Sequence, residues 1–341
     1  MAIILSHISA LEYLSSDQVN LDDWAINKVR DGWWLEASPF EADPDDLYRW
    51  PDEDPKSRKA AVGLVSEMGL STPVHTLVQD PANRYYDKRF CCHESSIPAD
   101  VKPFLKISNR LFACLPELCF IQMAQVLSLQ GLIALGYEIC GFYSLRQSGS
   151  GICRRRRPLT TAARLRSFAD GASGVYGAKK ARRAARCVID GAASPAETSL
   201  AMMMTLPYSL GGYGLPAPRL NHRVGCLGQM SGIYASAKDH MICDAVWPHV
   251  VVEYDSEQEH GTYKAMEKDA LRRNNLSLST AILQATKNML TDPKSTDHLA
   301  DLIARHEGHR INPRRVDYES RKQSLRKELN EAHGNTWLHL V

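Results

Sequence analysis

The sequence predicts an α/β protein with two domains. Apolar, strand-like segments alternate along the chain with segments of helical periodicity, which is the pattern of sheets flanked by helices. The chain has 341 residues, more than one average domain requires. Hydrophobic residues make up 44% and charged residues 23%, a balance that is ordinary for a soluble globular protein.

The N-terminal α/β domain is expected to span residues 1–150. Ser71–Val78 has the alternation of a strand, and Phe104–Phe112 is interpreted as another. Leu115–Ala134 follows with apolar residues at near-helical spacing, so one helix is expected there. The polar, glycine-containing segment Gln147–Gly151 indicates a flexible break, which we take as the domain boundary.

Residues 151–191 are strongly basic and are interpreted as a helical connector. Two short helices are expected over Thr160–Asp170 and Ala178–Asp190. A cationic segment of this kind can contact the phosphates of DNA, and it can equally be a solvated connector without a partner. The candidate nucleic-acid-binding residues are Arg154, Arg155, Arg156, Arg157, Lys179, Lys180, Arg182 and Arg183.

The composition favours a cytoplasmic protein without a membrane partner. No apolar run reaches the roughly 18 residues that a bilayer-spanning helix needs. Met1–His7 lacks the basic start of a secretory signal. The nine cysteines are odd in number and form no matching Cys-x-x-Cys pairs, so we expect reduced thiols and no structural zinc site.

A group of acidic residues carries the most specific signal. Two strand-like segments, Ile242–Val246 and Val250–Asp255, flank Trp247-Pro-His249. If they form an antiparallel hairpin, Asp244 lies opposite Glu253, and Asp255 points to the same face as Glu253. Three carboxylates on one face of a largely apolar hairpin repel one another unless a cation neutralises them. Their oxygen ligands suit Mg²⁺ or Mn²⁺. The alternative is an exposed hairpin whose acids face water and hold no metal.

Two residues beyond the hairpin extend this candidate site. His260 can transfer a proton near neutral pH, although a histidine in a polar loop is more often only solvated. Tyr263–Asn275 is expected to be a helix, on which Arg272 or Arg273 could hold a phosphate. The alternative for these arginines is a surface ion pair with Asp269.

The C-terminal region resembles a known nuclease family. The resemblance covers Ala192–Ile311, within an expected nuclease domain of residues 192–312. It rests on a helix with Glu197 in the capping box Ser194-Pro-Ala-Glu197, a strand near Arg219–Val224, and the motif residues Asp244, Glu253-Tyr-Asp255, His260 and Asp269-x-x-Arg272. These look like the nuclease domain related to very-short-patch mismatch repair endonucleases, within the PD-(D/E)XK superfamily. The resemblance implies a restriction-endonuclease-like mixed sheet flanked by helices, Mg²⁺ at Asp244, Glu253 and Asp255, and catalytic roles for His260 and Arg272. Residues 313–341 follow as a charged helix or tail.

A second resemblance concerns the N-terminal region. Leu5–Leu11 and Leu115–Phe120 look like short stretches of the type IV, abortive-infection antitoxin family. The resemblance implies an α/β region that binds DNA or a partner such as a toxin or defence-system protein. Ser6 and His7 are explained equally well as a helix N-cap and its neighbour.

Two functions follow from these observations. The first is a Mg²⁺- or Mn²⁺-dependent DNA endonuclease that hydrolyses phosphodiester bonds in defence or repair. The second is a non-catalytic DNA-binding regulator of the antitoxin class with a degenerate nuclease fold.

Overall fold

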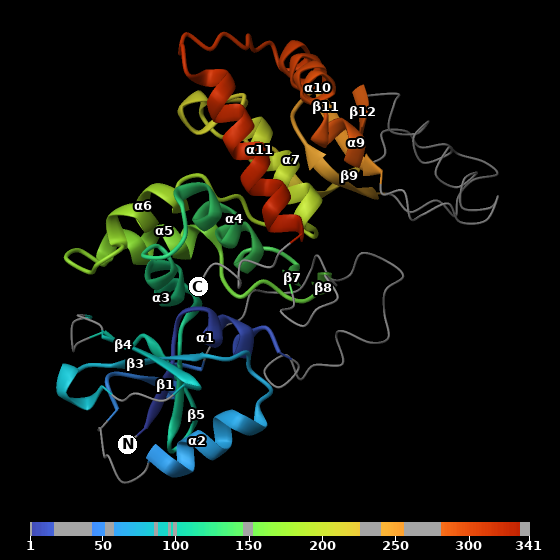
Figure 1. Cartoon of the computed structure of the whole chain (residues 1–341). Helices are drawn as coiled ribbons and strands as arrows, with labels where there is room; N and C mark the ends of the chain where they lie inside the picture. Colours follow the sequence, from blue (N-terminus) through green and yellow to red (C-terminus); the bar gives the residue numbers. More distant parts are fainter. Residues whose placement is uncertain are drawn as a thin grey trace, which may run out of the picture. The chain divides into compact units, whose positions relative to one another are not determined.

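A computed structural model describes residues 2–16, 43–51, 58–84, 88–94, 97, 101–145, 153–225, 240–255 and 281–334. The chain divides into two compact units (Figure 1). Unit 1 comprises Met1–Val188 with Gly334–Val341, and unit 2 comprises Ile189–His333. Both are mixed α/β structures, as the sequence predicts. The division falls close to the expected start of the second domain at residue 192, whereas 151–188 belongs to unit 1.

Unit 1 is built on a six-stranded sheet of order β2-β5-β6-β1-β3-β4. β1 is parallel to β6 and antiparallel to β3, and β3 is parallel to β4. The strands are β1 (Ile3–Leu5), β2 (Leu47–Tyr48), β3 (Val74–Val78), β4 (Phe90–Glu94), β5 (Phe104–Ser108) and β6 (Leu111–Cys114). Helices α1 (His7–Leu14) and α2 (Arg58–Glu67) lie against this sheet (Figure 1).

Two expectations for unit 1 are wrong in detail. Phe104–Phe112 is not one strand, because a turn after Ser108 separates antiparallel β5 from β6. Leu115–Ala134 is not one helix but two, α3 (Pro116–Met123) and α4 (Leu129–Ile139). The hydroxyl of Ser128 accepts the Gly131 N–H at 2.9 Å, so a new N-cap starts α4 where a continuous apolar pattern suggested no break.

The basic segment is folded onto unit 1. It contains β8 (Cys153–Arg155), which pairs with β7 (Tyr143–Leu145), and helices α5 (Ala162–Gly171) and α6 (Ala178–Ala185). α5 packs on α3 and α6, and α6 also packs on α4. The alanines at 178, 181, 184 and 185 are buried, so α6 packs through a face of small residues. These helices are thus part of the fold of unit 1.

Unit 2 is built on a four-stranded mixed sheet of order β12-β11-β10-β9. β9, β10 and β11 form an antiparallel meander, and β12 returns parallel to β11. The elements are α7 (Pro195–Thr205), β9 (Arg219–Gly225), β10 (His240–Val246), β11 (Val250–Asp255), β12 (Ala281–Thr286), α9 (Lys287–Thr291), α10 (Pro293–His306) and α11 (Tyr318–Gly334). A helix within 313–341 is thereby confirmed as α11.

The turn after α7 requires glycine. Gly211 has a φ of 89°, and a Cβ there would lie 2.3 Å from the carbonyl oxygen of Arg321 in α11. This close approach brings the turn against α11. The hydroxyl of Tyr318 adds a hydrogen bond of 3.1 Å to the carbonyl of Gly212. α11 therefore packs into unit 2.

Candidate functional site

The predicted β10–β11 hairpin forms with the predicted alignment. β10 ends at Val246 and β11 begins at Val250, and Val246 pairs with Val251. Trp247 closes the turn, since its backbone N–H donates to the Val250 carbonyl at 2.9 Å. The side chains of Trp247 and Val251 are buried. The buried apolar strand pair expected from the sequence is thus present.

The carboxylate of Asp244 lies beside the peptide bond that joins Glu253 to Tyr254. Backbone pairing of β10 with β11 runs over Ala245–Val252 and Val246–Val251. One step further out, Asp244 Oδ2 accepts the N–H of Tyr254 at 2.7 Å. The Asp244 and Glu253 side chains are both half-buried. This hydrogen bond fixes Asp244, one of the three predicted metal-binding carboxylates, next to the backbone that carries Glu253.

Glu197 forms the predicted capping box and also faces the hairpin. Its N–H donates to the Ser194 hydroxyl at 3.2 Å, and its carboxylate accepts the Ala193 N–H at 2.8 Å. The amide of Asn221 in β9 donates to the same carboxylate. Burial, followed by the negative charge of Asp244, raises the pKa of Glu197 to about 7. Glu197 therefore links the start of α7 to β9 beside Asp244.

The two hairpin acids offer the kind of oxygen ligands that a hard cation prefers. Mg²⁺ keeps several water ligands and needs only one or two protein carboxylates, so the predicted site requires only that Asp244 and Glu253 point to one ion. Asp255 lies in β11, but its side chain is outside the described residues. No three acidic side chains within the described ranges bring their oxygens within 4.8 Å of one another. The convergence of three carboxylates stays a prediction.

His260, Arg272 and the helix expected over Tyr263–Asn275 lie outside the described residues. β12 (Ala281–Thr286) pairs in parallel with β11 and places Gln284 opposite Glu253. The strand expected near Arg219–Val224 is present as β9. The four described strands of unit 2 thus form one continuous sheet from β12 to β9.

Some cations of the basic segment have partners within unit 1, and others are exposed to solvent. Arg156 is 2% exposed, and its guanidinium donates to the Glu138 carbonyl at 2.9 Å. It is therefore unavailable to a phosphate, and that expectation is wrong because the side chain supports the α4–β8 region instead. Lys180 Nζ donates to the Leu127 carbonyl at 2.9 Å, and Arg182 pairs with Asp170 at 2.9 Å.

The remaining cations of this segment form an exposed row. Lys179, Arg183 and Arg186 are exposed along α6 and its C-cap, spaced by four and three residues, which places them on one helical face. We call these three residues the α6 basic row. Arg157 is half-buried, and the side chains of Arg154 and Arg155 are outside the described part. Of the predicted cations whose side chains are described, Lys179 and Arg183 are the ones best placed for a polyanion.

If the chain binds DNA, as the sequence predicts, we expect the α6 basic row to set the salt dependence of that binding. Each lost phosphate contact reduces the log–log slope of affinity against salt by about 0.9, so replacing all three residues with Gln should reduce it by roughly 2–3. Fluorescence anisotropy in EDTA, which prevents cleavage, measures the slope. The matched control replaces three exposed cations of the sheet loops, Lys88, Lys102 and Arg110. Equal slopes for the two triple variants would contradict a role for the row.

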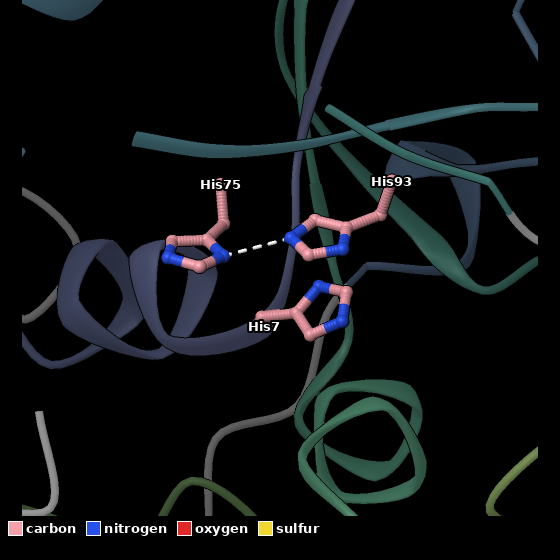
Figure 2. Close-up of side chains that lie close together, drawn as sticks. All are labelled: His7, His75 and His93. Carbon is pink, nitrogen blue, oxygen red and sulfur yellow. Dashed lines mark hydrogen bonds between the residues drawn. The ribbon is translucent and has the colours of Figure 1, made fainter. Parts of the chain in front are cut away.

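A second cluster, which the sequence did not predict, lies in unit 1. His7, His75 and His93 come from the start of α1, from β3 and from β4, and their rings face one another (Figure 2). His75 Nδ1 and His93 Nε2 are 2.8 Å apart. The ring of His93 stacks on that of His7 at 3.8 Å. One nitrogen from each ring lies within 4.8 Å of the others.

Burial favours the neutral form of these imidazoles. His7 and His75 are 3% and 4% exposed. Burial, followed by the charges of His93 and His75, lowers the pKa of His7 to about 2. Burial also lowers the pKa of His93, to about 4, and that of His75. The sequence signal for this cluster is weak. His75 lies within the apolar strand Ser71–Val78, and His93 follows the apolar run Phe90-Cys91-Cys92.

No protein-family model, curated protein or solved structure matches the chain. Among the residues that the structure describes, no helix is both long and apolar enough to cross a membrane.

Proposed function

We propose that unit 2 is a Mg²⁺- or Mn²⁺-dependent DNA endonuclease domain. The observation that carries this proposal is the position of the Asp244 carboxylate, which is hydrogen-bonded to the amide that follows Glu253 on the central hairpin of a mixed sheet. α7, the β9–β10–β11 meander and the parallel β12 match the helix-flanked mixed sheet that the nuclease resemblance implies. The restriction-endonuclease-like assignment is part of the proposal.

In this proposal Asp244 and Glu253 hold the metal ion, with Asp255 as a third ligand or as the residue that orients water. Bound Mg²⁺ would lower the pKa of water and neutralise charge on the phosphate. The Tyr254 amide holds the Asp244 carboxylate in place. His260 would supply or accept a proton, and Arg272 would hold the phosphate.

The substrate class rests on charge. The α6 basic row on unit 1 offers three exposed cations to a phosphate backbone. A cytoplasmic role in defence or repair, with a toxin or defence-system protein as a partner, belongs to the same proposal.

A cleavage assay tests the proposed function. Supercoiled plasmid and end-labelled single- and double-stranded DNA are incubated with the full chain and Mg²⁺, Mn²⁺ or EDTA. We expect metal-dependent nicking or cutting of DNA and none in EDTA, and an RNA oligonucleotide of equal length serves as the competing substrate. Binding of DNA without cleavage in any divalent metal would replace the endonuclease with the non-catalytic regulator.

A further inference from the structure

The three histidines of unit 1 are placed by backbone elements of the sheet. His75 and His93 lie on adjacent parallel strands, where His75 pairs with Cys91 and His93 with Leu77. His7 is the first residue of α1, and only Ser6 separates it from the end of β1. The N–H of Ser6 donates to the His75 carbonyl at 2.9 Å, and the N–H of His75 donates to the Ser9 hydroxyl at 2.9 Å. The start of α1 is thereby tied to β3.

His7 adopts a backbone conformation that few residues tolerate. Its φ is 50°, and this is one of two positive values at non-glycine residues in the described part of the chain. The N–H of His7 donates to Gln122 Oε1 of α3 at 2.8 Å, and its Nδ1 lies 3.0 Å from the Ser6 hydroxyl. Strained backbone of this kind is found at functional sites, where the surrounding structure imposes it. Here the strained conformation carries an imidazole into contact with His93.

The spacing of the nitrogens suits a transition metal. Zinc binds histidine nitrogen at about 2.0–2.1 Å, so nitrogens around a tetrahedral ion lie roughly 3.3–3.4 Å apart. The distance between His75 Nδ1 and His93 Nε2 is 2.8 Å. All three ligand atoms lie within 4.8 Å of one another. In a metal-bound form, side-chain rotations would have to open the His75–His93 separation toward this value, and bonds to the ion would replace the direct contact between the two imidazoles.

One side of the cluster opens into a pocket. The pocket has a volume of about 370 Å³ and is lined by His7 and His93 together with Arg84, Glu94, Gln122 and Tyr176, among others. Zinc sites with three protein ligands keep a fourth position for water or substrate, whereas structural sites are closed by four protein ligands. Three histidine ligands beside a polar pocket correspond to a zinc site with three protein ligands and one open coordination position.

We propose that His7, His75 and His93 bind a divalent transition metal, with Zn²⁺ as the best fit, and leave one coordination position open to the pocket for water or a small anion. The site goes beyond the proposed nuclease function, since it lies in the other unit and uses nitrogen ligands instead of carboxylates. Metal binding at the three histidines requires no DNA, and a negative result for this site would leave the proposal for Asp244 and Glu253 unchanged.

Metal titration of the full chain tests the site. Protein stripped with a chelator is titrated with Zn²⁺ by calorimetry and with Co²⁺ by visible absorption. We expect one tight equivalent of Zn²⁺, a rise in melting temperature, and Co²⁺ ligand-field bands typical of four or five ligands. Addition of azide should shift these bands if the fourth position is open. A wild-type protein that binds no tight equivalent would overturn the proposal.

Variants locate the ion. His7→Asn retains a residue type that tolerates positive φ, and His75→Gln and His93→Gln keep polar side chains of similar size. Each should weaken Zn²⁺ binding by more than about 100-fold, since loss even of an outer-shell partner costs 10–100-fold. The exposed His309→Gln and Asp301→Asn variants should bind the tight equivalent as the wild type does. Circular dichroism verifies folding, and unchanged Zn²⁺ affinity in all three folded ligand variants would exclude the cluster.

Discussion

Asp244→Asn and Glu253→Gln should each abolish metal-dependent DNA cleavage, with a loss of about 10³-fold or more. Loss of a metal ligand removes charge neutralisation worth several kcal/mol at the transition state, and each 1.36 kcal/mol is a factor of ten in rate. Asn at 244 retains a carbonyl oxygen that can accept the Tyr254 N–H, so the hairpin should keep its alignment. Initial rates of plasmid nicking in Mg²⁺ and Mn²⁺ measure the effect.

The controls separate loss of metal from loss of folding. Asp301→Asn removes an exposed acid that pairs with Arg305 in α10, and it should cleave at the wild-type rate because exposed pairs contribute little. His260→Ala should still bind metal and DNA but cleave about 10²–10⁴-fold more slowly. Arg272→Ala should weaken the transition-state interaction with the phosphate. Cleavage by Asp244→Asn at the wild-type rate would show that the hairpin is not the active site.

Local signals were sufficient to predict the framework of the candidate site. Ser194, Pro195 and Glu197 specify a helix start through short-range hydrogen bonds, and α7 begins as predicted. The apolar segments on either side of Trp247-Pro-His249 fix the hairpin alignment, because a shift by one residue would turn Val251 away from the core. These features depend on neighbours in the sequence, which is why they could be predicted.

Long-range packing determined what the sequence did not reveal. The run of arginines from 154 to 157 suggests a uniformly exposed cationic surface. Arg156 is nevertheless buried, and its guanidinium donates a hydrogen bond to the carbonyl of Glu138. α6 buries its alanines against α4 and α5, so some of its cations form hydrogen bonds or ion pairs within unit 1 and others are exposed. No local pattern distinguishes Lys180 from Lys179 before the packing of α6 is known.

The histidine cluster depends on strand order. His75 and His93 come together because β3 and β4 are parallel neighbours at one end of the sheet. His7 joins them because β1 lies on the other side of β3. The sequence contains no spacing motif that links the three residues, so only the topology brings their nitrogens together.

Trp247→Ala should destabilise unit 2 by about 3–5 kcal/mol, the range for deleting a large buried aromatic side chain. Trp247 is 2% exposed at the turn between β10 and β11, and its indole N–H donates to the Pro216 carbonyl at 2.7 Å. Because this residue closes the hairpin that carries Asp244 and Glu253, cleavage should fall together with stability. Urea unfolding followed by circular dichroism measures the effect on the transition of unit 2.

Two further variants distinguish packing from hydrogen bonding at this turn. Trp247→Phe retains most of the buried apolar surface but loses the bond to Pro216, so a smaller loss of about 1–2 kcal/mol is expected. Tyr176→Ala removes an aromatic side chain that is 74% exposed in unit 1, and it should change the unfolding of unit 2 by less than about 0.5 kcal/mol. A loss below about 1 kcal/mol for Trp247→Ala would mean that the turn does not depend on the indole. The alignment of Asp244 with Glu253 would then have to come from the strand pairing of Ala245 and Val246 alone.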